Sequence, residues 1–196
     1  MIEGQLDAVR KLEEKKIPQN PPPGLSEEEY ADWQSEISWF EERYERDFPS
    51  KVRYSFLVLL YIIVETRLRD TCNEITKRKN LVFEESDFRG SAIERVKIFL
   101  NKAVKIPACR QETWQGLKDF QKIRDCIVHT NGQIEKSKKP KRIKELCTKD
   151  IGLLDDAGTL IVKREYCTKA LKIAQEFFDQ MLQAAEFGPP FQVVEE

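Results

Sequence analysis

Apolar residues recur at steps of three and four along most of the chain, the spacing that puts side chains on one face of an α-helix. The first clear stripe follows Ser26 and Glu29, whose spacing is that of a capping box. Its members are Tyr30, Trp33, Ile37, Phe40 and Tyr44. The stripe predicts a helix that begins after Ser26 and ends near Phe48-Pro49.

The longest apolar run, residues 56–64, falls in the next predicted helix, which we place from a cap at Ser50 to about Lys79. Its first half is apolar on all sides, so we expect it to be the central, most buried helix. Its second half narrows to one stripe, which a carboxylate interrupts. The members of the stripe are Tyr54, Leu57, Tyr61, Glu65, Leu68, Cys72 and Ile75.

Three more helices are predicted in the rest of the chain. A capping box at Ser91 and Glu94 opens one that stops before Pro107, and a second runs from about Glu112 to His129 and ends at 131–132 (Asn-Gly). The segment 136–144 is expected to be a basic loop. Residues 151–154 and 160–162 predict a hairpin turning at 156–158, and a last helix covers about 164–186.

These elements predict an all-α fold, a helical bundle with a short β-hairpin insertion and extra N-terminal helices. We divide the chain into an N-terminal helical extension, residues 1–48, a helical domain, 49–188, and a flexible tail, 189–196. The extension holds a short charged helix over about 3–16 and a stiff Pro-rich linker that includes Pro18 and 21–24.

Composition limits the function classes. The formal net charge is -1, so any attraction to a nucleic acid backbone must come from a local basic patch. Five scattered cysteines without a CxxC spacing and a single histidine argue against a disulfide framework and a metal site. No phosphate-binding glycine motif or nucleophile elbow occurs, so we expect no cofactor. The apolar run is too short for a membrane span, and we expect a cytoplasmic protein without membrane contact.

Arg124 is the candidate that stands out physically. On an ideal helix it lies within about 60° of Leu117, Phe120 and Val128, in the middle of the apolar face. Burying a guanidinium, which cannot be neutralised in a protein, costs several kcal/mol unless it is paired. Glu65 interrupts its own stripe in the same way, so we predict a Glu65–Arg124 pair. Such a pair either serves a site or only fixes the register of two helices.

The only histidine of the chain, His129, follows Asp125 by four residues, which places the two side chains together on a helix surface. A carboxylate there can orient the imidazole. On an ideal helix His129 lies about 140° around from Arg124. We therefore expect the last turn before Asn131 to unwind if the ring is to join the arginine. The alternative role for His129 is that of a helix cap.

The segment 124–129, Arg-Asp-Cys-Ile-Val-His, followed by Thr-Asn-Gly, resembles the Arg-x4–6-His signature of the HEPN superfamily. The lead-in with Trp114, Leu117 and Phe120, the preceding helix with Glu65, the hairpin and the closing helix also resemble that family. The resemblance covers roughly residues 50–186. It departs from the family at Asp125, where Asn or His is frequent.

The resemblance implies a homodimer whose motif helices face each other and an RNA endonuclease that works without metal. The 2′-hydroxyl would attack the adjacent phosphorus and leave a 2′,3′-cyclic phosphate. His129 would move protons, Arg124 would stabilise charge on the phosphoryl oxygens, and Glu65 would hold Arg124. A toxin–antitoxin or defence setting, with a neutralising antitoxin as partner, is likewise implied only by the resemblance.

A basic run begins seven residues after His129 and could grip flanking phosphates, or it could be an ordinary solvated loop. The candidate substrate-binding residues are Asn131, Lys136, Lys138, Lys139, Lys141 and Arg142, with Lys144 nearby.

Two other functions stay open. One is a non-catalytic HEPN-like module that binds nucleotide, RNA or protein, which Asp125 and the acidic residues 84–87 favour. The other is a helical adaptor that docks a partner through the aromatic residues 26–48.

Overall fold

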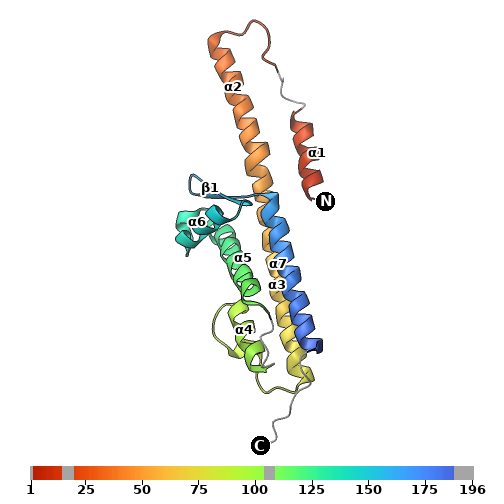
Figure 1. Ribbon diagram of the computed structural model, residues 1–196. Helices are drawn as coiled ribbons and strands as arrows, with labels where there is room; N and C mark the ends of the chain where they lie inside the picture. The colour runs from red at the N-terminus through yellow and green to blue at the C-terminus, as the bar shows by residue number, and fades with distance from the viewer. Residues whose placement is uncertain (1, 15–19, 104–108, 188–196) are drawn as a thin grey trace, which may run out of the picture. The chain divides into compact units, whose positions relative to one another are not determined.

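The structure, a computed structural model, describes residues 2–14, 20–103 and 109–187 of the chain. The chain forms two compact units, Met1–Arg53 and Tyr54–Glu196. Its described part is mostly helical with one two-stranded antiparallel sheet, which confirms the all-α prediction with a short hairpin (Figure 1). Among the described helices, none is both long and apolar enough to span a membrane. Pro18 and the predicted tail 189–196 lie outside the described residues.

The first unit contains α1 (Ile2–Glu14), α2 (Glu27–Glu41), the π-helical segment η1 (Glu42–Asp47) and the start of α3 (Phe48–Arg78). The predicted capping box is confirmed, since the Ser26 backbone N–H donates to Glu29 at 2.8 Å. The predicted helix end near Phe48-Pro49 is wrong, and so is the predicted cap at Ser50, because η1 leads into α3 without a non-helical residue. Pro49 instead lies just after the π-helical segment, where the helix already departs from regular α-helical hydrogen bonding.

The second unit continues along α3 and adds η2 (Glu85–Asp87), α4 (Ala92–Ala103) and α5 (Gln111–Thr130). The predicted capping box of α4 is confirmed, since the Ser91 backbone N–H donates to Glu94 at 3.1 Å. After α5 come η3 (Ile134–Lys136), α6 (Pro140–Lys149), β1 (Leu153–Asp156), β2 (Thr159–Val162) and α7 (Arg164–Phe187). The strands pair from Leu153–Val162 to Asp156–Thr159.

The prediction of a basic loop over residues 136–144 is wrong for its second half. Helix α6 begins at Pro140, a favoured first helical residue because its missing N–H would have no partner there. Ile143 is 1% exposed and anchors α6 in the core. The lysines and Pro140 favoured a loop, although Ile143, Leu146 and Cys147 recur at helical spacing and pack against the core.

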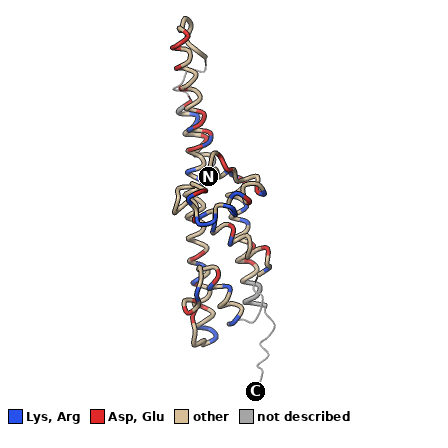
Figure 2. Tube along the Cα trace, turned by 90° about the vertical axis from the view of Figure 1, so that its left-hand side faces the viewer, with Lys and Arg blue, Asp and Glu red and all other residues tan. Residues whose placement is uncertain are grey.

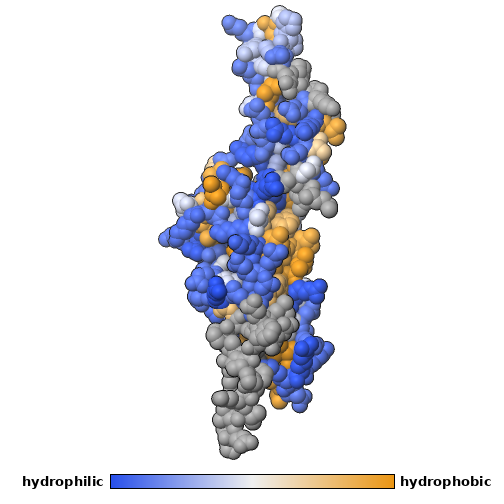
Figure 3. Space-filling view, turned by 45° about the vertical axis from the view of Figure 1, so that its right-hand side comes forward, coloured by the Kyte–Doolittle hydropathy of each residue, from blue (hydrophilic) through white to orange (hydrophobic). Residues whose placement is uncertain are grey.

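The core lies between the apolar faces of α3, α4, α5 and α7, and the largest fully buried side chains include Tyr61, Phe99, Phe120 and Phe177. The prediction that the first half of α3 is buried on all sides is wrong in part. Leu59, Ile62 and Ile63 are 59%, 48% and 48% exposed. Figure 3 shows apolar side chains (orange) interrupting a mostly polar surface.

The C-terminal end of α5 is locked in place by the hairpin. Asn131 and Gly132 have positive φ angles of 52° and 82°, which end the helix as predicted. The Gly132 carbonyl accepts from the Leu160 N–H at 2.8 Å, and the Tyr54 hydroxyl donates to the Leu160 carbonyl. A Cβ atom on Gly132 would lie 2.0 Å from the Tyr54 hydroxyl oxygen, so only glycine fits here.

Candidate functional site

The candidate motif residues lie in the last two turns of α5, which is a regular helix through Thr130. Seven of its side chains are buried, and they define the face that packs against the rest of the unit. These are Thr113, Trp114, Leu117, Phe120, Ile123, Cys126 and Ile127. Arg124 and Asp125 lie at the edge of this face, and Val128 and His129 are exposed. The helix therefore presents the motif along the border between core and solvent.

Arg124 is partly buried, with 23% of its side chain exposed. Its Nη1 donates to the Asp125 carboxylate at 2.9 Å. Its Nε is buried and has no hydrogen-bond partner among the described residues. The guanidinium carbon lies 4.9 Å from the centre of the Tyr61 ring, in cation–π contact. An aromatic face and one carboxylate thus hold the charge, while part of its donor capacity is unused.

Glu65 does not form the predicted pair with Arg124. Ion pairs within 4.0 Å among the described residues join Arg124 to Asp125 and not to Glu65. Glu65 lies instead beside the hydroxyl group of Tyr61, one turn earlier on α3, without reaching hydrogen-bond geometry. The reason is the Tyr61 ring, which occupies the space facing Arg124. Glu65 of α3 and Arg124 of α5 therefore both lie near Tyr61, whose ring faces Arg124.

Burial raises the pKa of the Tyr61 hydroxyl well above its ordinary value, and the charges of Glu65 and Asp125 raise it further, against a lowering by Arg124. These interactions show that the four side chains share one electrostatic environment. The phenol stays protonated at neutral pH, so Arg124 faces a neutral ring. We call Tyr61, Glu65, Arg124 and Asp125 the arginine cluster.

His129 is exposed in the last turn of α5, and the described residues give it no ion pair with Asp125 within 4.0 Å. The turn does not unwind, since the helix continues to Thr130. Thr130 supports this turn by donating from its hydroxyl to the Cys126 carbonyl at 2.7 Å. The imidazole therefore keeps its helical position, about 140° around α5 from Arg124.

The predicted substrate-binding residues divide into two groups. Arg142 is engaged in a structural contact, because its Nε and Nη2 donate to Asp119 at 3.1 and 2.7 Å. Lys144 pairs with Glu135. Asn131 is exposed at the end of α5, and the remaining lysines are exposed on η3, in the turn before α6 and on α6 itself. These are Lys136, Lys138, Lys139 and Lys141. Elsewhere residues of both charges are scattered along the chain, except on α2, which carries acidic residues and no Lys or Arg (Figure 2).

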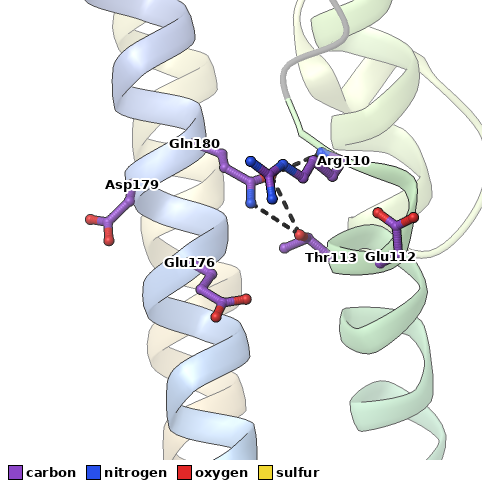
Figure 4. A pocket seen from close by; sticks show the side chains of 6 residues that line it. All are labelled: Arg110, Glu112, Thr113, Glu176, Asp179 and Gln180. Atoms are coloured by element: carbon purple, nitrogen blue, oxygen red, sulfur yellow. Dashed lines mark hydrogen bonds between the residues drawn. The ribbon is translucent and has the colours of Figure 1, made fainter.

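A cavity of about 500 Å³ lies at the opposite end of α5, where that helix begins beside α7 (Figure 4). The backbone N–H of Arg110 donates to the Gln180 side chain at 2.8 Å, and Thr113 bonds to the same side chain. Three carboxylates, of Glu112, Glu176 and Asp179, line the cavity. It contains none of the predicted site residues and lies about 28 Å along the helix from His129.

Trp114, part of the lead-in to the motif, is 4% exposed and packs edge-on against Phe177, with ring centroids 4.8 Å apart. All five cysteines are free thiols. Among the described residues, no group of three or more His, Cys, Asp or Glu side chains is placed to hold a metal ion.

Sequence reasoning missed Tyr61 as a member of the arginine cluster and Asp119 as the partner of Arg142. Tyr61 carried a signal, because it precedes Glu65 by four residues on the same stripe, and Phe120 precedes Arg124 by the same interval. Comparisons with protein-family models, with curated proteins and with solved structures found no match.

Proposed function

We propose that the chain is a metal-independent RNA endonuclease of the HEPN type. The observation that carries the proposal is the state of Arg124. It is a permanently charged group at the rim of the core, stacked on a buried ring, with unused donors and with the chain's lone histidine five residues further along the same helix. The resemblance of residues 124–132 to the Arg-x4–6-His signature supplies the reaction.

The proposed reaction is an internal transesterification of RNA. The 2′-oxygen forms a bond to the adjacent phosphorus and the bond from phosphorus to the 5′-oxygen breaks, which leaves a 2′,3′-cyclic phosphate and a 5′-hydroxyl. His129 moves protons between the 2′-hydroxyl and the departing 5′-oxygen. Arg124 donates hydrogen bonds to the phosphoryl oxygens as charge accumulates on them. The need for a 2′-hydroxyl restricts the substrate to RNA.

The separation of Arg124 and His129 on α5 favours a site shared by two copies of the chain. The helix face midway between them lies about 70° from each. It carries Val128, which is 46% exposed, and Asp125, whose side chain is 39% exposed. We propose a homodimer that pairs this face across a two-fold axis, so that each arginine approaches the histidine of the other copy. The exposed lysines of η3 and α6 would then hold the flanking phosphates.

The test is cleavage of RNA by the purified protein in the presence of EDTA. We expect products with 2′,3′-cyclic phosphate ends, and we expect Arg124→Ala and His129→Ala each to lower kcat by about 10²-fold or more, in a protein that elutes as a dimer and unfolds like the wild type. Undiminished cleavage by both variants would refute the mechanism.

A second candidate is a non-catalytic module of the same type that binds RNA or nucleotide. The Arg124–Asp125 ion pair favours it, because a carboxylate bonded to the guanidinium competes with a phosphate for the same donors. The two functions separate cleanly by experiment. A binding module retards RNA on a native gel and leaves its length unchanged, whereas the enzyme yields cyclic phosphate ends.

A further inference from the structure

The guanidinium group of Arg124 rests on a ring that is itself immobilised. Tyr61 is 0% exposed, and Phe120 packs edge-on against it, with ring centroids 5.4 Å apart and planes at 84°. Phe120 lies one turn before Arg124 on α5, so the helix that carries the arginine also clamps the ring beneath it. A ring fixed in this way fixes the height and the plane of a cation stacked on its face.

The hydrogen bonds of Arg124 do not by themselves fix the orientation of its guanidinium group. Only Nη1 has a partner, the Asp125 carboxylate, which is the adjacent residue on the same helix. Nε is buried without a hydrogen-bond partner among the described residues. An arginine held by one flexible neighbour would sample several orientations, because its side chain has four rotatable bonds. The contact with Tyr61 at 4.9 Å comes from another helix and removes that freedom.

We propose that Tyr61 is a positioning residue of the ribonuclease site. Its ring face holds the guanidinium of Arg124 so that Nη2, which has no hydrogen-bond partner among the described residues, can donate to a phosphate group. The inference rests on the proposed function and replaces Glu65 with Tyr61 as the residue that orients Arg124. Glu65 lies beside the Tyr61 hydroxyl and would influence Arg124 only through the position of the Tyr61 ring.

Two substitutions separate the ring from its hydroxyl group. Tyr61→Phe removes the hydroxyl group and keeps the aromatic ring. Tyr61→Leu keeps an apolar side chain and removes the aromatic ring. We expect the Phe variant to retain kcat within about threefold. We expect the Leu variant to lose about tenfold or more in kcat with little change in KM, because an arginine out of place weakens the transition state more than the bound RNA.

The matched control is Phe99→Leu. Phe99 is equally buried at 0% exposure, but it lies on α4 and packs against Phe83, away from Arg124. This variant should lose similar stability in urea denaturation and keep its kcat. If Phe99→Leu and Tyr61→Leu lower kcat equally, Tyr61 is only a core residue and the proposal is overturned.

NMR of the arginine side chains tests the positioning without cleavage. The stacked ring should shift the Arg124 Nε–H proton signal upfield in the wild type and in Tyr61→Phe, and the shift should vanish in Tyr61→Leu. Inorganic phosphate should perturb the Arg124 Nη–H signals in the first two proteins and not in the third. If RNA is not cut but these shifts appear, the proposed function fails and the positioning stands; an Arg124 signal that is the same in all three proteins overturns the positioning.

Discussion

Two arginine–aspartate pairs in the second unit each include an aspartate of helix α5, but they differ in how many nitrogens of the guanidinium group are hydrogen-bonded. Arg142 reaches from α6 to Asp119 with two hydrogen bonds, and its third nitrogen donates to Glu145 at 2.9 Å. Arg124 donates only from Nη1, to Asp125, and its Nε is buried without a hydrogen-bond partner in the described part of the chain. One guanidinium has a partner for each nitrogen, and the other is left with unused donors.

The difference is why we propose Arg124, and not Arg142, as the arginine of the site. A bidentate pair with a carboxylate that is 14% exposed fixes the position of α6 and engages the Nε and Nη2 of Arg142 in a structural contact. A stacked cation with free donors retains its capacity to bind an anion, at a cost in stability that a purely structural residue would not need. Proximity to the motif in sequence did not separate these roles, since both arginines were site candidates.

The largest expected effect on stability comes from Arg142→Ala. The substitution leaves the mostly buried Asp119 carboxylate with Lys122, 2.9 Å away, as its remaining ion pair among the described residues. We expect the free energy of unfolding to fall by about 2–3 kcal/mol, measured by urea denaturation. Arg124→Ala should lower it by about 1 kcal/mol or less. Equal losses for the two variants would remove the distinction drawn between the pairs.

A smaller effect is expected from Asp125→Asn, which keeps the shape of the side chain and removes the charge that faces Arg124. The guanidinium then meets a phosphate without a competing carboxylate. We expect RNA affinity to rise by roughly three- to tenfold, measured by fluorescence anisotropy in EDTA with the His129→Ala background to prevent cleavage. Asp119→Asn, the matched change at the other pair, should leave RNA affinity unchanged. Unchanged or weaker binding by Asp125→Asn would mean that Asp125 assists the site.

The smallest effect is a dependence of stability on pH. Burial by itself would raise the pKa of Asp119, but hydrogen bonds from Arg142 and Lys122 outweigh it and leave the pKa below its ordinary value. The stability that Asp119 contributes is therefore complete above the unfolded pKa of about 4 and is lost as the pH falls through the lower folded value. The stability difference between wild type and Arg142→Ala, measured by urea denaturation, should stay level from pH 7 to about pH 5 and shrink as the pH falls further toward about pH 3. A constant difference would show that Asp119 is not the charge that Arg142 neutralises.

Several features of the chain followed from the sequence because local rules decide them. The capping boxes at Ser26 and Ser91, the stop at Asn131-Gly132 and the hairpin before α7 depend on residues within a few positions of one another. Periodicity placed Arg124 in the middle of the apolar face of α5, whereas in the structure it lies at the edge of that face with 23% of its side chain exposed. By contrast, α6 and the continuous passage from α2 through η1 to α3 escaped prediction. Pro140 and Pro49 are local signals for a loop or a helix end, but here Pro140 begins a helix and Pro49 lies within one.

The sequence alone determined that a charge would interrupt the apolar face of α5 and that another would interrupt α3, since a helix turns by a fixed angle per residue. Only the tertiary structure decided what Arg124 touches. Tyr61 and Glu65 lie one turn apart on the same stripe, and the relative height and rotation of two packed helices choose between them. That choice depends on how the side chains of the whole core interlock, which no single segment of sequence encodes.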